Sequence, residues 1–137
     1  MSARDIHKIL VPVDLSSCSR AGLELACSLA IQLSACIEVL LVQEPERSSG
    51  PELAIAKREL QRFIATVPDA LHTVLRERVE VGEARERIVA IAEAGGFDAL
   101  VLGTHGLTGR AHSLAGSVAE SVVRTASCPV FTVRERD

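Results

Sequence analysis

The chain has 137 residues, a formal net charge of −3 and 47% hydrophobic residues, which together predict one globular domain over 1–137. Aromatic residues make up only 2%, and this scarcity, with the acidic balance, argues against a nucleic-acid partner. No apolar run reaches the roughly 20 residues of a membrane span and no secretory signal is visible, so we expect a cytoplasmic protein without membrane contact.

The N-terminal third of the chain predicts two strands around one helix. Residues 8–13 are a run rich in β-branched residues, and Asp14 follows it directly. The serines two and three positions later are candidate N-caps for a helix over about 18–35, where apolar residues recur at helical spacing. A second strand is predicted over 37–42.

The middle of the chain continues this alternation. Pro, Gly and Ser predict a loop over 44–51, and apolar residues then recur at helical spacing from Leu53 to Val67. Pro68 is expected to end this second helix. Residues 73–81 alternate apolar and charged side chains, which is typical of an edge strand with one face in water.

The C-terminal third adds two more pairs of helix and strand. A third helix includes 84–92 and leads to a wholly apolar strand over 99–102, as expected for a central parallel strand. A fourth helix includes 118–126 and leads to a last strand over 129–133. Strands that alternate with helices imply an α/β fold, in which a parallel sheet carries helices on both faces.

Two strand ends carry residues suited to a ligand site. In an open α/β sheet, ligands bind beyond the carboxyl ends of the strands. One strand ends at Asp14, and another runs into a glycine-rich segment that reaches the start of the last helix at Gly116-Ser117. Glycines let backbone amides approach a ligand closely, and a helix N-terminus attracts phosphate. Because a carboxylate accepts hydrogen bonds from ribose hydroxyls, the two features together suggest a nucleotide.

The alternative is a glycine-rich connection ahead of a capped helix, with no ligand. The segment is not a P-loop, because the two lysines of the chain, Lys8 and Lys57, lie outside it. It is also not a dinucleotide fingerprint, because the first strand is followed by DLSSCS rather than by a glycine pattern.

These segments resemble the universal stress protein family. That family's nucleotide motif is G-x2-G-x9-G-[ST], and the chain has Gly103-TH-Gly106-LTGRAHSLA-Gly116-Ser117 with every spacing kept. The segments KILVPVDLSS, AGGFDALVLGTHG and GSVAESVVRTASCPVFTV resemble the family's first strand, its fourth strand and loop, and its last helix and strand. Because the full motif is kept, the chain resembles the branch of the family that binds ATP.

The resemblance implies a strand order and a set of contacts. The five-stranded parallel sheet would have the order 3-2-1-4-5, like that of the adenine nucleotide alpha hydrolase fold, with a crevice between strands one and four. Asp14 would hold the ribose. The adenine site would be lined by Pro12, Val13 and Val42. The contacts to ribose and phosphates would come from Gly103, Gly106, Gly116, Ser117 and Val118. Thr104, Gly109 and Arg110 are further candidate nucleotide-binding residues, and Arg110 could contact a phosphate.

The expected ligand is ATP, with AMP and ADP as alternatives. Mg²⁺ would be held mainly by phosphate oxygens and water, and no residue is expected to be a metal ligand. No residue is expected to be catalytic, because the glycine segment holds no carboxylate and Glu120 should point away from the crevice. We therefore expect binding without turnover, or at most slow ATP hydrolysis.

The resemblance also implies a homodimer. The last strand would pair antiparallel with its mate across a two-fold axis, through Pro129, Val130, Phe131, Thr132 and Val133. The implied function is a regulatory stress-response protein, in which nucleotide orders residues 104–115 and a partner reads that order. The alternatives are a dimeric interaction protein that needs no nucleotide, and a slow ATPase.

Overall fold

The computed structural model describes residues 5–105 and 117–135 and shows one five-stranded parallel sheet. The strand order is β3-β2-β1-β4-β5, which confirms the predicted order. The strands are β1 (Lys8–Val13), β2 (Cys36–Gln43), β3 (Val74–Val81), β4 (Ala99–Gly103) and β5 (Val130–Val133). The helices are α1 (Ser17–Leu33), α2 (Gly50–Ala65), α3 (Ala84–Ala94) and α4 (Ser117–Thr125). Among the described residues, no helix combines the length and apolar character of a membrane span.

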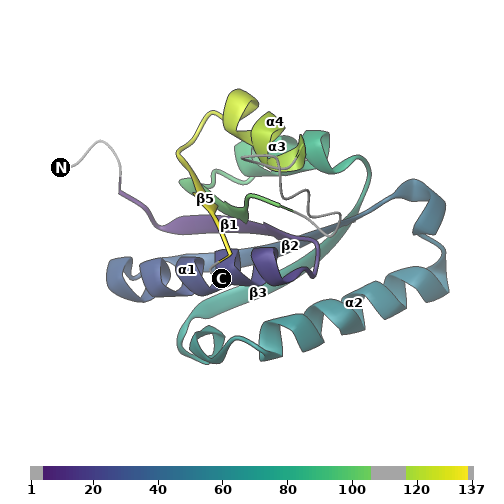
Figure 1. The fold of residues 1–137 in the computed structure, drawn as a ribbon, viewed down its shortest axis with the longest axis horizontal. Helices are drawn as coiled ribbons and strands as arrows, with labels where there is room; N and C mark the ends of the chain where they lie inside the picture. The colour runs from purple at the N-terminus through teal and green to yellow at the C-terminus, as the bar shows by residue number, and fades with distance from the viewer. Residues whose placement is uncertain (1–4, 106–116, 136–137) are drawn as a thin grey trace.

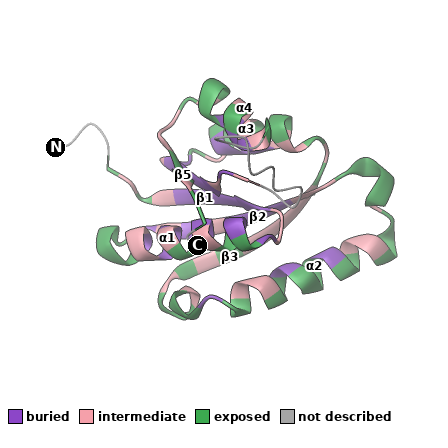
Figure 2. Cartoon of the chain, viewed as in Figure 1, coloured by how far each residue is buried: buried purple, intermediate pink, exposed green. Residues whose placement is uncertain are grey.

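Helices cover both faces of the sheet (Figure 1). α1 and α2 pack on one face, and α3 and α4 pack on the other. Successive residues of β1 divide between the two layers, because side chains alternate along a strand. Ile9 and Val11 lie in the core under α1 and α2, whereas Leu10 lies in the core under α3 and α4. Figure 2 shows the buried residues concentrated in the central strands and on the inward sides of the helices.

The connection between β2 and α2 is more ordered than the sequence predicts. In place of a loop over 44–51, the structure has a 3₁₀-helix, η1 (Pro45–Arg47), and α2 begins at Gly50. The cause is a capping box: the Ser49 hydroxyl accepts from the Glu52 N–H at 3.3 Å, and the Glu52 carboxylate accepts from the Ser49 N–H at 3.1 Å. Pro51, one of the two prolines in the predicted loop, sits in the first turn of the helix, where its missing N–H has no cost.

The end of α2 also departs from a simple stop at a proline. Pro68 begins a second 3₁₀-helix, η2 (Pro68–His72), which packs against α1. Val67, expected as the last apolar residue of the helix, lies just beyond it and is buried.

β3 is an edge strand, as its alternating pattern predicts. Leu75 and Val79 pack against the core under α1 and α2. On the opposite face, the Arg78 guanidinium lies 2.8 Å from the Glu80 carboxylate. Val81 was expected on the apolar face but is 41% exposed, because it is the last residue of the strand.

At the amino ends of the central strands, Asp98 ties β1 to the start of β4. Its Oδ2 atom accepts hydrogen bonds from the backbone N–H groups of His7 and Lys8, both at 2.9 Å. The Asp98 N–H donates to the Lys8 carbonyl at 2.8 Å. The Lys8 ammonium donates to the Gly95 carbonyl and lies 4.6 Å from the centre of the Phe97 ring. This end of the sheet is therefore held by contacts within the chain.

Candidate functional site

A tight turn places Asp14 at the carboxyl end of β1. Leu15 adopts a φ of 69°, in the left-handed region that a leucine rarely occupies. The Asp14 carboxylate accepts from the Ser16 N–H at 3.1 Å, and the Asp14 N–H donates to the Ser19 hydroxyl at 3.4 Å. Ser16 is the N-cap of α1, as predicted, because its side chain accepts from the Ser19 N–H at 3.1 Å. The strained leucine thus turns the chain from strand to helix within three residues.

The carboxyl end of β4 packs tightly against α1. A Cβ atom on Gly103 would lie 2.7 Å from the carbonyl oxygen of Cys18, and one on Gly22 would lie 3.2 Å from the Gly103 nitrogen. Glycine at these positions lets the helix approach the strand. The glycine-rich pattern predicted a different reason, namely close approach of a ligand. The missing Cβ of Gly103 points toward Cys18, which gives a packing reason for this glycine, and Gly103 also lines the pocket described below.

The residues after β4 connect this region to β5. The Thr104 N–H donates to the Val133 carbonyl at 2.9 Å, and the Thr104 hydroxyl lies 3.0 Å from Nδ1 of His105. The Cys18 thiol donates to the same Val133 carbonyl at 3.5 Å. Thr104 and Cys18 are both only 5% exposed and His105 is half-buried, so this polar cluster is partly buried where α1, β4 and β5 meet.

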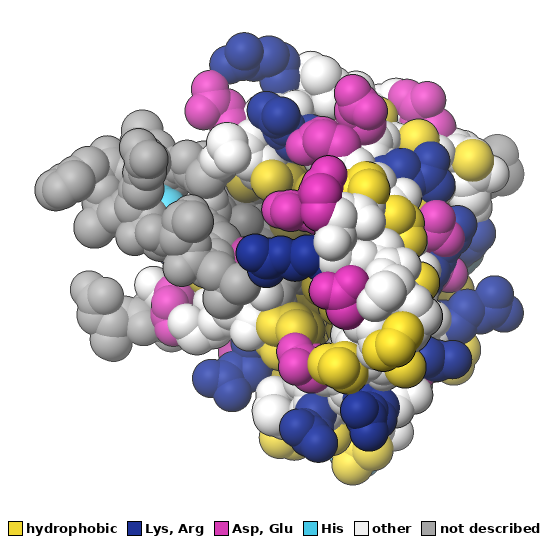
Figure 3. All heavy atoms as spheres, turned by 90° about the vertical axis from the view of Figure 1, so that its right-hand side faces the viewer, with side chains coloured by type: hydrophobic (Ala, Val, Ile, Leu, Met, Phe, Trp, Pro, Cys, Tyr) yellow, Lys and Arg dark blue, Asp and Glu magenta, His cyan; other side chains and the backbone are white. Residues whose placement is uncertain are grey.

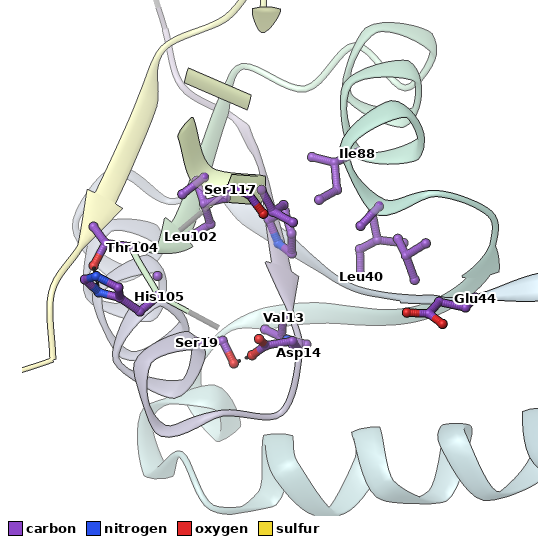
Figure 4. A pocket seen from close by; sticks show the side chains of 16 residues that line it. Val13, Asp14, Ser19, Leu40, Glu44, Ile88, Leu102, Thr104, His105 and Ser117 are labelled. Carbon is purple, nitrogen blue, oxygen red and sulfur yellow. Dashed lines mark hydrogen bonds between the residues drawn. The ribbon is translucent and has the colours of Figure 1, made fainter. Parts of the chain in front are cut away.

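A pocket of about 450 Å³ opens at the carboxyl ends of β1, β2 and β4. Its volume lies within the range of small-molecule sites. The polar part of the wall comes from Asp14, Ser19, Glu44, Thr104, His105 and Ser117. The apolar part comes mainly from Pro12, Val13, Leu40, Val42, Ala84, Ile88, Leu102 and Val118. Figure 4 shows Asp14 and Ser19 on one side of the pocket and Glu44 on the other. Leu40 of β2 and Ile88 of α3 lie near each other on the side toward α3.

The structure brings together the predicted site residues that it describes. This one pocket is lined by Pro12, Val13, Asp14, Val42, Gly103, Thr104, Ser117 and Val118. The other predicted residues, Gly106, Gly109, Arg110 and Gly116, lie outside the described residues, as does most of the segment 104–115 that nucleotide was expected to order.

The side chain of Glu120 lies away from the pocket wall. Its carboxylate pairs with the Arg124 guanidinium at 2.9 Å, one turn further along α4, and is 61% exposed. Glu120 does not line the pocket, in agreement with the prediction.

Several wall residues were missed by sequence reasoning. These are Ser19, Leu40, Glu44, Ala84, Ile88, Leu102, His105 and Ala119. Ala84 and Ile88 lie one turn apart on α3, and their spacing marked them as core residues. The pattern cannot show that the core is open at this end. Glu44 sits in the predicted loop and carried no signal of its own.

The described wall of the pocket is acidic rather than basic. Among these residues, Asp14 and Glu44 carry carboxylates and none is Lys or Arg. Figure 3 views the side of the molecule on which these strands end, and acidic and basic side chains are interspersed there. The described residues contain no group of three or more His, Cys, Asp or Glu that could hold a metal ion.

A parallel sheet with its pocket at the switch point between β1 and β4 defines a doubly wound α/β protein. The model of the Universal stress protein family matches residues 5–134. The chain therefore belongs to the universal stress protein family.

Individual relatives agree with this assignment. Universal stress protein MJ0531 of Methanocaldococcus jannaschii is 31% identical over 143 residues, covering 93% of this chain and 82% of the relative. The structure of protein MJ0577 from the same organism is similar, with a TM-score of 0.82, 26% identity and coverage of 97% and 99% of the two chains. Universal stress protein UspA from Lactobacillus plantarum follows with a TM-score of 0.78, 28% identity and coverage of 97% and 100%.

A further similar structure contains a ligand. It is a universal stress protein in complex with cAMP, with a TM-score of 0.69 and 28% identity over 93% of this chain and 95% of that one.

Proposed function

We propose that this protein binds an adenine nucleotide in the pocket at the carboxyl ends of β1, β2 and β4. The observation that carries the proposal is the convergence of Asp14, the end of β4 and the first residue of α4 on one pocket. The Asp14 carboxylate is suited to accept hydrogen bonds from ribose hydroxyls. Ser117 lies at the N-terminus of α4, where a phosphate is favoured by the helix dipole.

The apolar part of the wall supports a purine base as the other end of the ligand. Leu40 and Ile88 present buried aliphatic side chains there, and Val42 adds a half-buried one. A purine ring is flat and largely apolar on its faces, so this wall suits it. The complex of a similar universal stress protein with cAMP is consistent with an adenine nucleotide.

Within this class we propose ATP with Mg²⁺, and AMP or ADP as alternatives. The described wall holds two carboxylates and no Lys or Arg side chain, so it does little to offset the charge of a triphosphate. Mg²⁺ held by phosphate oxygens and water supplies that missing positive charge. ATP affinity should therefore fall when Mg²⁺ is chelated, and AMP affinity should change less.

Calorimetric titration of nucleotide-stripped protein tests the proposal. We expect heat on addition of ATP with Mg²⁺ or of AMP, and a loss of affinity of at least about tenfold in Asp14→Ala, because a charge-assisted hydrogen bond is lost. Asp69→Ala is the matched control, since Asp69 is exposed on η2 and does not line the pocket. Absence of heat with every nucleotide, together with no thermal shift, contradicts the proposal.

We also propose a homodimer through β5, which makes the protein a dimeric, nucleotide-responsive regulator in the stress response. β5 lies at the edge of the sheet, and Phe131 is 37% exposed on it. Antiparallel pairing of Pro129 to Val133 with a second copy would cover this edge. Sedimentation should show a dimer that Phe131→Lys converts to monomer. A wild-type monomer at high concentration contradicts this part of the proposal, and a dimer that binds no nucleotide favours a dimeric interaction protein instead.

A further inference from the structure

Building on the adenine-nucleotide site proposed above, we propose that Glu44 is a specificity-determining residue of the pocket. Its carboxylate selects a base that carries an exocyclic amine over one that carries a carbonyl at the same position.

The backbone of Glu44 is held firmly at the rim of the pocket. The residue comes directly after β2 and precedes η1, whose first residue is Pro45. The Glu44 carbonyl accepts from the Arg47 N–H at 2.9 Å and from the Ser48 hydroxyl at 2.6 Å. These two bonds and the adjacent proline restrict the backbone that carries the carboxylate.

Glu44 stands apart from the other polar groups of the wall. Figure 4 shows Thr104 and His105 toward one side of the pocket and Glu44 toward the opposite side, with Asp14, Ser19 and Ser117 between them in this view. With the ribose at Asp14 and the phosphates at Ser117, the base would lie toward the part of the wall that holds Leu40, Ile88 and Glu44. The faces of that base would meet aliphatic side chains, so the carboxylate is the described side chain placed to bind its polar edge.

An ionised carboxylate accepts hydrogen bonds and donates none. An exocyclic amine, as in adenine, offers it an N–H donor. A carbonyl at the same position, as in hypoxanthine, brings a second acceptor against it and loses that bond. Among the described residues, Glu44 is not one of the partners in an ion pair, so no described Lys or Arg side chain is paired with its carboxylate.

The test compares AMP with IMP, which differ in this exocyclic group and in the proton on N1. Calorimetric titration should give the wild-type protein at least about fivefold tighter binding of AMP, a size suited to a charge-assisted bond at an exposed side chain. In Glu44→Gln the ratio should fall toward one, because the amide can donate to the carbonyl. Glu46→Gln is the matched control: Glu46 is exposed on η1, carries the same charge and does not line the pocket. It should keep the wild-type ratio.

Each other outcome overturns the inference. Equal affinities for AMP and IMP in the wild-type protein, or an unchanged ratio in Glu44→Gln, overturn it while leaving the nucleotide site in place. GMP binding as tight as that of AMP, and lost in Glu44→Gln, would show that the carboxylate binds the N1 and N2 edge of guanine instead. Failure of every nucleotide to bind overturns both this inference and the proposed function.

Discussion

Asp98 and Asp14 lie at opposite ends of the two central strands, and the same side chain has a different role at each end. Asp98 accepts two backbone N–H groups at the amino end, where the chain closes on itself. Asp14 accepts the Ser16 N–H at the carboxyl end and borders a pocket of about 450 Å³. The pocket beside Asp14, rather than the residue type, therefore separates a structural carboxylate from one that can meet a ligand.

The largest predicted effect concerns the carboxyl end of β4, where close packing on α1 also stabilises the fold. Gly103→Ala should lower the free energy of unfolding by roughly 2–3 kcal/mol, because the new Cβ would meet the Cys18 carbonyl at 2.7 Å. Chemical denaturation measures this loss. Gly50→Ala is the control, since nothing lies within 4 Å of its Cβ position and the substitution should be close to neutral. Equal stability of the two variants would contradict the close packing of β4 on α1.

The next prediction concerns the Asp98 contacts at the amino ends of the central strands. Asp98→Ala should lower the free energy of unfolding by about 2 kcal/mol, because it leaves the N–H groups of His7 and Lys8 without their shared acceptor. Nucleotide affinity should stay at the wild-type value, since Asp98 does not line the pocket. Denaturation and titration of the same preparation give both quantities. A variant that keeps its stability but loses nucleotide binding would reverse the roles assigned to the two ends.

The smallest predicted effect concerns a third carboxylate, Glu80 of β3. The hydrogen bond from Arg78, assisted by one from Arg87, holds the pKa of Glu80 below its ordinary value. A lowered folded-state pKa means that ionised Glu80 adds stability above the unfolded pKa of about 4.3, and that this stability is lost as the pH falls through the folded pKa.

Glu80→Gln should therefore cost a few tenths of a kcal/mol at pH 7, about the value of a partly exposed ion pair, and nothing near pH 2. Denaturation at the two pH values measures the difference between variant and wild type. A difference in free energy of unfolding between variant and wild type that is larger near pH 2 than at pH 7 would contradict this prediction. Nucleotide binding should be unaffected, which would show that a carboxylate toward the carboxyl end of a strand is structural when arginines satisfy it.

Most of the fold was predictable because strands and helices here follow apolar periodicity closely. The alternation along β3 marked it as an edge strand, and the uniformly apolar β4 marked it as central. The order of the strands came from the resemblance to a family, since periodicity alone does not order a parallel sheet. The prediction of a loop over 44–51 was partly wrong. Its Pro and Gly residues indicated a loop, but Ser49 and Glu52 form the capping box that starts α2.

The site was predictable only where position along a strand carries meaning. Asp14 was found because it follows a buried strand, at the end where α/β sheets bind ligands. Ile88 was not, because a helical pattern shows an inward face but not whether that face meets a cavity. Gly103 was found for an incomplete reason, since only three-dimensional packing shows Cys18 behind it.

Backbone amide NMR during titration with AMP is the most direct test of the central claim, that nucleotide binds at the carboxyl ends of β1, β2 and β4. We expect the largest chemical-shift changes at residues 12–14, 42–44, 103–105 and 117–119, which border the pocket. Residues 95–98, at the amino end of the sheet, should shift little. Changes centred on the amino end or on α2, or no changes at millimolar AMP, would contradict the account.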